Sequence, residues 1–421
     1  MGRVQQLAPR TAHGFARPPT LAHLLTLQYL YPMLWLPSRH APRRFRHWSA
    51  LATMLLSLLP GVRLHAQDLM NTGTVAGVVR AAPTNVPLPY AVLAISSVGI
   101  ERFSGADGRY LLTQVPAGTY QLQVRRIGFV PQTFTVTVTA GATTTLDIGL
   151  VQVPVRLTAM LVRPVEPCLK PGLPDPSKEP GIATLVELLR ENAETYRTLV
   201  QQHPYAYAIY RALGSTLNDS VRITNIGAER INGIRAVRYK PGKVVESARG
   251  QSTMQLPTVL DLTDKAFIEN HCFHYRGTSV NNGDTWFSLE VRAAEKIKAP
   301  DVHGIFWLDS ATAQLRRMEL ELSRPDKLPS QLRDIQAVVV RTTFLEIAPG
   351  LSVVDDVCAI NFLRPGKRPQ PHPLELQHVQ GVAFVGAAPP DVAPRRDFPN
   401  PSWIAGGRLR LDQLSCSEIA R

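Results

Sequence analysis

Residues 107–129 read DGRYLLTQVPAGTYQLQVRRIGF, and this stretch decides the fold of the first part of the chain. At 120–124, Tyr, Leu and Val alternate with glutamine, which is the period-two pattern of a strand with one buried face. The same alternation recurs at 133–138 and 146–150. Because several short runs of this kind follow one another, the sequence predicts a small β-sandwich at 72–153.

Two tight turns separate these runs. Asp107-Gly108 predicts a hairpin turn, because glycine accepts the positive φ that such turns require. Pro116-Ala117-Gly118 predicts a second turn, since proline presets the φ of the residue that opens it. Strands bounded in this way stay short, as those of a sandwich do.

Three of these segments, 106–110, 115–120 and 125–129, resemble the carboxypeptidase regulatory-like family, an immunoglobulin- or transthyretin-like sandwich of exported bacterial proteins. The resemblance covers about a fifth of the chain. It implies a fold shared with carbohydrate-binding-like modules, which occur beside zinc carboxypeptidases and at the head of some TonB-dependent receptors. It does not imply peptidase activity.

The remaining residues form no recognisable catalytic constellation. Zinc carboxypeptidases need a His-x-x-Glu pair, a distant third histidine and a glutamate base, whereas His372-x-x-Glu375 is followed only by His378. The sequence has no Gly-x-Ser-x-Gly elbow and no glycine-rich phosphate loop. A TonB-dependent receptor is excluded as well, because the many strands of its barrel need a far longer chain. We therefore predict that the protein is not an enzyme and has no cofactor and no metal site.

Residues 1–66 predict a leader that ends in a secretory signal peptide. Basic residues at 39–46 precede an apolar run at 50–59, and cleavage is expected between Ala66 and Gln67. The apolar run is shorter than the roughly 20 residues that span a bilayer. We expect an exported protein, in the periplasm or at the outer membrane or cell surface of a bacterium.

The formal net charge of +13 is largely a property of this leader. Eight arginines and no Asp, Glu or Lys lie in it, so the other 355 residues carry only +5. No basic run with interleaved aromatic residues follows, and we predict no nucleic-acid partner. Membrane contact is expected only if the leader stays uncleaved, an alternative favoured by the second apolar stretch at 21–36. Met33 is an alternative start.

The rest of the chain predicts a second domain of α+β class. A Pro-rich linker is expected at 154–180, and apolar residues at helical spacing from Ile182 to Val200 predict one amphipathic helix. Apolar and alternating runs then predict strands of an antiparallel, half-barrel-like sheet at 205–210, 221–226, 236–239, 286–291, 305–308, 315–322, 337–345, 351–354 and 357–363.

Two further features define this domain, which we place at 181–385. The hairpin at 304–319 is similar to those of exported half-barrel proteins that carry lipid or lipoprotein. The prolines between 364 and 401 predict loop or linker, and 386–421 predicts a Pro-rich C-terminal tail.

Four cysteines, Cys168, Cys272, Cys358 and Cys416, lie beyond the sandwich. In an exported protein we expect them to form disulfides that attach the linker and the tail to the second domain. Three pairings are open, and the sequence does not choose among them. A zinc site is disfavoured, because no Cys-x-x-Cys pair is present.

Other candidate ligands have an ordinary structural interpretation. His271 and His274 would face opposite sides of a strand, which leaves only Cys272 and His274 together. No Asp-x-Asp-x-Asp-Gly calcium loop occurs. We interpret the remaining acids as solvated turn residues: Asp301, Asp309, Glu346, Asp355 and Asp356.

A speculative binding surface comprises Arg125, Arg126, Tyr110, Trp286 and Trp307. Arginines and a tyrosine near strand ends of the sandwich could contact a sugar or an acidic partner. The tryptophans could line an apolar groove on a curved sheet, and packing in the core is the alternative for them. The carbohydrate interpretation depends on the family resemblance.

Together these features predict a non-enzymatic envelope protein that acts as a binding or accessory module. The expected partner is an envelope protein, a glycan or an apolar ligand. One alternative is a hydrolase without a sequence signature, which would require Asp301, Asp309, Asp355 or Asp356 to converge with a histidine. The other is a purely structural spacer without a pocket.

Overall fold

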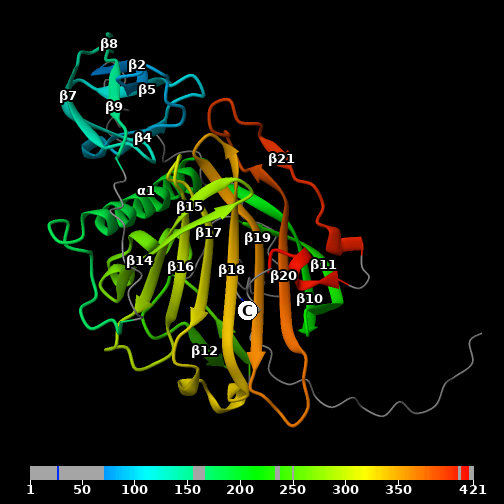
Figure 1. Ribbon diagram of the computed structural model, residues 1–421. Helices are drawn as coiled ribbons and strands as arrows, with labels where there is room; N and C mark the ends of the chain where they lie inside the picture. Colours follow the sequence, from blue (N-terminus) through cyan, green and yellow to red (C-terminus); the bar gives the residue numbers. More distant parts are fainter. Residues whose placement is uncertain are drawn as a thin grey trace, which may run out of the picture.

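The computed structural model describes residues 26–27, 71–154, 166–232, 238–248, 251–405 and 409–416. A small β-sandwich lies at one end of a large curved sheet, and a long helix lies between the two (Figure 1). The predicted leader, its cleavage site and Met33 lie outside the described residues, apart from a two-residue strand within 1–66.

The sandwich has two four-stranded sheets that pack face to face, as the alternation predicts. The faces that meet are apolar and include Val75, Leu93, Leu112, Leu122 and Ile148. One sheet comprises β2 (Thr72–Ala82), β5 (Arg109–Pro116), β8 (Thr143–Thr145) and β9 (Ile148–Val151). The other has the order β4 (Ile100–Phe103), β3 (Val92–Ile95), β6 (Gly118–Arg125) and β7 (Gln132–Val138).

Asp107-Gly108 does not close a hairpin, which corrects the prediction from this dipeptide. Gly108 does adopt a positive φ of 76°. The turn instead carries the chain from β4 in one sheet to β5 in the other. The local turn chemistry was therefore predicted, but the partners of the flanking strands were not, because packing of the two sheets decides them.

The second domain is built on one open, antiparallel, eleven-stranded sheet, so the expected mainly β and α+β class is confirmed. Its main path is β14-β15-β16-β17-β18-β19-β20-β10-β11-β22, with β21 added beside β20. The strands are β10 (Tyr205–Leu217), β11 (Ser220–Asn232), β14 (His271–Asn281), β15 (Asp284–Ala293), β16 (Val302–Asp309), β17 (Leu315–Leu322), β18 (Ile335–Ala348), β19 (Leu351–Leu363), β20 (His372–Phe384), β21 (Arg395–Asp397) and β22 (Leu409–Arg410).

Short elements complete this domain. β12 (Val245–Ala248) and β13 (Gln251–Met254) form a separate small sheet with β1 (Thr26–Leu27). The helical turns are α2 (Lys265–Ile268), η3 (Val259–Thr263), η4 (Pro325–Lys327), η5 (Ser330–Leu332), η6 (Ser402–Ala405) and η7 (Leu411–Gln413), with η2 (Ser96–Val98) in the sandwich.

β20 corrects the expectation that the Pro-rich region 364–401 is loop. This strand lies inside the sheet and pairs with β10 on one side and with β19 and β21 on the other. Only Pro373 falls within it, at the second residue, where one missing N–H disturbs the ladder little. Proline density alone therefore misidentified a central strand.

Helix α1 (Pro180–Gln202) spans the predicted amphipathic run. Pro180 fits the first turn, where its missing N–H has no helical partner in any case, and Pro204 follows the end. The buried side of α1, which includes Leu185, Leu189 and Leu199, packs in one core with the inner face of the sheet. This helix thus covers the concave side of the sheet (Figure 1).

The outer face of the sheet carries a second core, formed with the C-terminal segment. Trp403, Leu411 and Leu414 pack there against Ile360 and Leu376 of the central strands. Disulfide Cys358–Cys416 joins this segment to β19, and Cys168–Cys272 joins the linker to β14. The structure thus selects one of the three open pairings, and both bridges attach a flanking segment to the second domain as expected.

We expect the double substitution Cys358→Ala/Cys416→Ala to lower the free energy of unfolding by about 2–4 kcal/mol, because the bridge restricts the unfolded chain. Urea titration of oxidised wild type and of the variant measures this. The matched control is the variant Cys168→Ala/Cys272→Ala, which keeps only the Cys358–Cys416 bridge and is titrated with and without reductant. Equal midpoints for the variant and the oxidised wild type would contradict the expectation.

Candidate functional site

The sandwich is docked on the second domain through the segment 125–129, one of the three that carry the family resemblance. Ile127 belongs to the same buried core as helix α1 and the large sheet, together with Tyr90, Val92 and Phe103 of the sandwich. Phe103 also stacks on His203 just after α1, with ring centroids 5.9 Å apart. The two domains therefore share apolar packing rather than being joined by a linker alone.

Arg125 forms the polar centre of this junction. Its side chain is 8% exposed, and its guanidinium lies 2.7 Å from Oε1 of Glu101 in the sandwich and 3.7 Å from Oε2 of Glu191 in α1. It also donates to the hydroxyl of Thr198 at 3.0 Å, and that hydroxyl donates to Glu101 at 2.9 Å. Burial raises the pKa of Glu191, and the charge of Arg125 opposes this effect.

Arg126 makes a second polar contact between the two domains, at the β18–β19 turn. It donates to the carbonyl oxygens of Pro89 and Pro349, and burial lowers its pKa to about 10 despite the nearby Glu346. Pro349 precedes Gly350, whose φ of 83° favours glycine and whose Cα faces the Arg126 guanidinium without room for a side chain. The β18–β19 turn is thus shaped to receive this arginine.

Two hydrogen bonds extend the junction toward the C-terminal part of the chain. The Tyr90 hydroxyl donates to the carbonyl of Pro390 at 3.0 Å, and the Ala106 amide donates to the carboxylate of Asp391 at 3.0 Å. The sandwich therefore contacts three separate parts of the second domain: helix α1, the β18–β19 turn and residues 390–391.

A polar cleft of about 370 Å³ opens beside Arg125, between the sandwich and α1. We call it the junction cleft. Both domains contribute its walls, and the side-chain amides of Gln123 and Gln201, both exposed, make no hydrogen bond to another described residue. The lining side chains are polar or charged for the most part: Ser96, Glu101, Gln123, Arg125, Glu194, Arg197, Gln201 and Gln202.

A wider groove of about 790 Å³ lies on the sandwich and extends to Pro390. Asp107, Arg109 and Asp147 line it together with Leu111, which is 61% exposed. Tyr110 also borders this groove, but its side chain is buried and its hydroxyl donates to the carbonyl of Leu146 at 2.6 Å. Burial accordingly raises the pKa of Tyr110.

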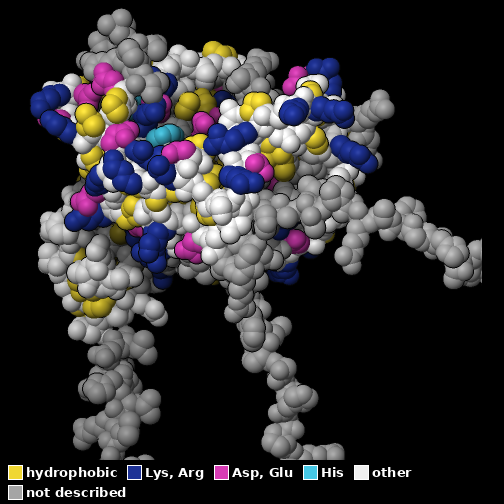
Figure 2. Space-filling model, turned by 90° about the horizontal axis from the view of Figure 1, so that it is seen from below, with side chains coloured by type: hydrophobic (Ala, Val, Ile, Leu, Met, Phe, Trp, Pro, Cys, Tyr) yellow, Lys and Arg dark blue, Asp and Glu magenta, His cyan; other side chains and the backbone are white. Residues whose placement is uncertain are grey.

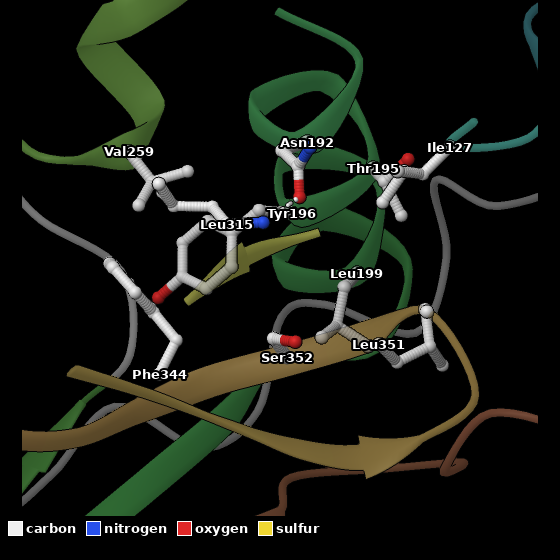
Figure 3. A pocket seen from close by; sticks show the side chains of 11 residues that line it. Ile127, Asn192, Thr195, Tyr196, Leu199, Val259, Leu315, Phe344, Leu351 and Ser352 are labelled. Atoms are coloured by element: carbon white, nitrogen blue, oxygen red, sulfur yellow. Dashed lines mark hydrogen bonds between the residues drawn. The ribbon is translucent and has the colours of Figure 1, made fainter. Parts of the chain in front are cut away.

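Side chains of α1 and of the sheet line a small cavity between them (Figure 3). This cavity, which is lined by Asn192 and Tyr196 of α1 and by Phe344, Leu351 and Ser352, measures about 20 Å³. That volume holds roughly one water molecule. This part of the half-barrel is therefore a packed core and offers no room for a lipid chain.

Three tyrosine hydroxyls help to close this core. Tyr205 donates to Tyr196 at 2.9 Å, and the hydroxyl of Tyr207 lies 3.1 Å from Tyr205 and 3.3 Å from Tyr196. The backbone amide of Val354 donates to Tyr207 at 3.3 Å. The phenols thus satisfy one another where water is excluded, as buried hydroxyls require.

One group of acids converges with a histidine, in part as the hydrolase alternative requires. Asp355, Asp356 and His378 each offer a ligand atom, and all three atoms lie within 4.8 Å of one another. Burial and then Asp356 raise the pKa of Asp355 to about 6. Burial works to lower the pKa of His378, but its hydrogen bond to Asp356 and the charge of Asp356 raise it overall. No serine, threonine or cysteine nucleophile bonds to this histidine among the described residues.

The interpretation of these acids as solvated turn residues was wrong. Asp355 and Asp356 lie half-buried within β19, and Glu346 lies within β18. Asp301 is fully buried and accepts hydrogen bonds from the Tyr239 hydroxyl and the Gly242 amide. Asp309 does sit at a turn, where it accepts the amides of residues 311 and 312, but it is buried.

Sequence reasoning missed His378 because its partners are 22 residues away. The only available signal was the alternation of apolar and polar residues at 374–379, which marks a strand that the surrounding prolines concealed. His271, by contrast, is buried in the core. Its ring stacks on that of Phe267, with centroids 4.1 Å apart, and its Nε2 lies 4.0 Å from Oδ1 of Asp301.

Trp286 of β15 pairs with Asp309 and Trp307 of β16 pairs with Ser288, so the two tryptophans lie diagonally across the neighbouring strands. Arg317 of β17 stacks on both, with its guanidinium carbon 4.0 Å from the Trp307 ring and 5.6 Å from the Trp286 ring. Trp307 is buried and Trp286 half-buried. The structure therefore does not bring these tryptophans together with Arg125, Arg126 and Tyr110.

Residues 74–151 match the family model of the carboxypeptidase regulatory-like domain. The sandwich is a domain of this family. The match agrees with the resemblance inferred from the sequence and leaves the second domain unassigned. No curated protein matches the chain.

Three solved structures are similar to parts of this chain at low identity. A cohesin–X-dockerin complex from Acetivibrio cellulolyticus is 18% identical over 18% of this chain and 56% of that chain, with a TM-score of 0.17. A putative outer-membrane lipoprotein-sorting domain from Vibrio parahaemolyticus is 10% identical over 48% and 94%, with a TM-score of 0.26. A putative carbohydrate-binding protein from Bacteroides uniformis is 10% identical over 59% and 94%, with a TM-score of 0.17. The chain spans little more than half of the first of these.

The surface charges, the helices and the disulfides give information on the compartment in which the protein folds. On the face shown in Figure 2, Lys and Arg side chains are interspersed with Asp and Glu and form no single basic patch. Within the described ranges, none of the helices has the length and apolar character needed to cross a bilayer. The two disulfides indicate a protein that folds outside the cytoplasm.

We expect Arg125→Met to lower the free energy of unfolding by about 3–5 kcal/mol, because it leaves Glu101 and Glu191 without their buried counter-charge. Arg109→Met is the matched control: its ion pair with Asp107 is exposed, so its loss costs about 0–1 kcal/mol. Urea denaturation of both variants measures the difference. Similar midpoints for the two variants would show that Arg125 does not hold the junction.

Proposed function

We propose that this protein is an exported, non-enzymatic accessory protein of the bacterial envelope that binds a glycan or a peptide segment of an envelope protein in the junction cleft. The observation that carries this proposal is the cleft itself, which two firmly docked domains build together from polar side chains. Ligand sites occur preferentially at such domain interfaces, and a volume of about 370 Å³ is within their usual range.

The residues of the cleft suit a polar ligand. Glutamine side chains offer both donors and acceptors, and Gln123 and Gln201 are exposed to a ligand from opposite walls. Arg197 and Glu194 add charges of both signs in the wall formed by α1. A ligand with alternating donors and acceptors, such as a sugar chain or an extended peptide, matches this lining better than an apolar one.

Rigid docking supports recognition. Arg125 joins Glu101 in the sandwich wall to Thr198 of α1, so little conformational entropy is lost when a ligand enters. A purely structural spacer would need no such opening. An apolar ligand under α1 is disfavoured by the packed core, whose cavity measures about 20 Å³.

Binding can be tested on arrays that display bacterial envelope oligosaccharides and peptides. We expect wild type to retain specific probes and the double variant Gln123→Ala/Gln201→Ala to lose at least tenfold in affinity for them, because the hydrogen bonds from both walls are removed. Thr135→Ala on the exposed face of the sandwich is the matched control. Mass spectrometry of each bound probe then reports whether the protein cleaves it.

Two results would contradict the proposal. Equal binding by the cleft variant and the wild type would place the ligand elsewhere. Turnover of a probe would show that the protein is an enzyme.

A further inference from the structure

The side chains of Asp355, Asp356 and His378 meet because of an irregularity in the sheet. Asp356 lies directly opposite His378 in the β19–β20 register. In the β18–β19 register, Thr342 pairs with Val357 and Phe344 with Val354, so Thr343 alone faces both aspartates. This two-against-one arrangement is a β-bulge, which re-aims side chains and recurs beside functional sites. It brings two consecutive carboxylates, which a regular strand would point to opposite faces, toward one histidine.

His378 is oriented by a group outside this cluster. Its Nε2 lies 2.9 Å from the carbonyl oxygen of Pro399, which can only accept, so Nε2 carries a proton. Its Nδ1 lies 2.8 Å from Oδ1 of Asp356 and faces the two carboxylates. Metal-binding histidines are held in the same manner, with one ring nitrogen donating to a carbonyl and the other free for the metal.

The charges in the cluster do not balance. Asp355 and Asp356 bring two carboxylates, whereas His378 can supply one positive charge. Among the described residues, the Asp355 carboxylate accepts no hydrogen bond and has no cationic group within 4.0 Å, although the residue is half-buried beside Asp356 and His378. A carboxylate in this setting is costly unless a cation neutralises it.

We propose that Asp355, Asp356 and His378 bind a divalent transition-metal ion of the Zn²⁺ class. One imidazole nitrogen with two carboxylate oxygens is a donor set that Zn²⁺ accepts, and three protein ligands leave a fourth position for water or a ligand atom. On binding, the metal takes the place of the proton on Nδ1 of His378, and that proton passes to solvent. The Nε2–H···O hydrogen bond to Pro399 is kept.

This site is independent of the junction cleft, since the two share no residue. It would join β19 and β20 and, through Pro399, the segment that follows β21. The metal site can therefore be present or absent whatever the cleft binds.

Isothermal titration of the oxidised, metal-free chain with ZnCl₂ tests the proposal. We expect one Zn²⁺ per chain, release of protons that depends on buffer ionisation, and a rise in the thermal midpoint as Zn²⁺ is added. Asp355→Asn and His378→Gln should each weaken binding by at least tenfold. Asp397→Asn and His372→Gln, an exposed acid on β21 and another histidine of β20, are the matched controls and should bind as wild type does.

A second measurement keeps the test decisive if a variant misfolds. Co²⁺ added to wild type should give visible absorption bands of a nitrogen–oxygen site, and these should be absent in Asp355→Asn with an unchanged near-ultraviolet circular dichroism spectrum. No Zn²⁺ uptake by wild type, or equal uptake by Asp355→Asn and Asp397→Asn, would overturn the proposal.

Discussion

The guanidinium of Arg125 lies between carboxylates of two different domains, and the arrangement of the whole molecule depends on this buried contact. A buried arginine is tolerated only where counter-charges and acceptors surround it, so Glu101, Glu191 and Thr198 must come together for the sandwich to dock. Apolar packing by Ile127 and Phe103 supplies the affinity of the interface, while the arginine fixes its register. Arg125 and Glu101 also line the junction cleft, so the contact that joins the two domains forms part of its wall.

The two faces of the large sheet in the second domain pack against different segments of the chain. Its inner face packs against α1, and three tyrosines hydrogen-bond to one another there, so the cavity between the described residues of α1 and the sheet measures only about 20 Å³. The C-terminal segment packs on the outer face of β10, β11 and β18 to β20, and Cys358–Cys416 joins this segment to β19. The central strands of this sheet therefore carry packed side chains on both faces.

The cluster of Asp355, Asp356 and His378 forms because the pairing of β18 with β19 is irregular. A regular strand would send Asp355 and Asp356 to opposite faces, and only the bulge opposite Thr343 brings both to His378. The carbonyl of Pro399 then orients the ring from the segment after β21. Each of these contributions comes from a different part of the chain, so their combination is a property of the folded sheet.

The sequence by itself determined the sandwich and its family, the amphipathic helix, most of the strands and the formation of disulfides, because each depends on local periodicity, turn chemistry or cysteine content. Only the tertiary structure decided the pairing of the cysteines, the place of β20 among the central strands and the burial of Arg125 at a junction. It also decided the meeting of Asp356 with His378. These features depend on strand register and on domain docking. Both bring together residues that are far apart in the chain, so a short stretch of sequence cannot predict them.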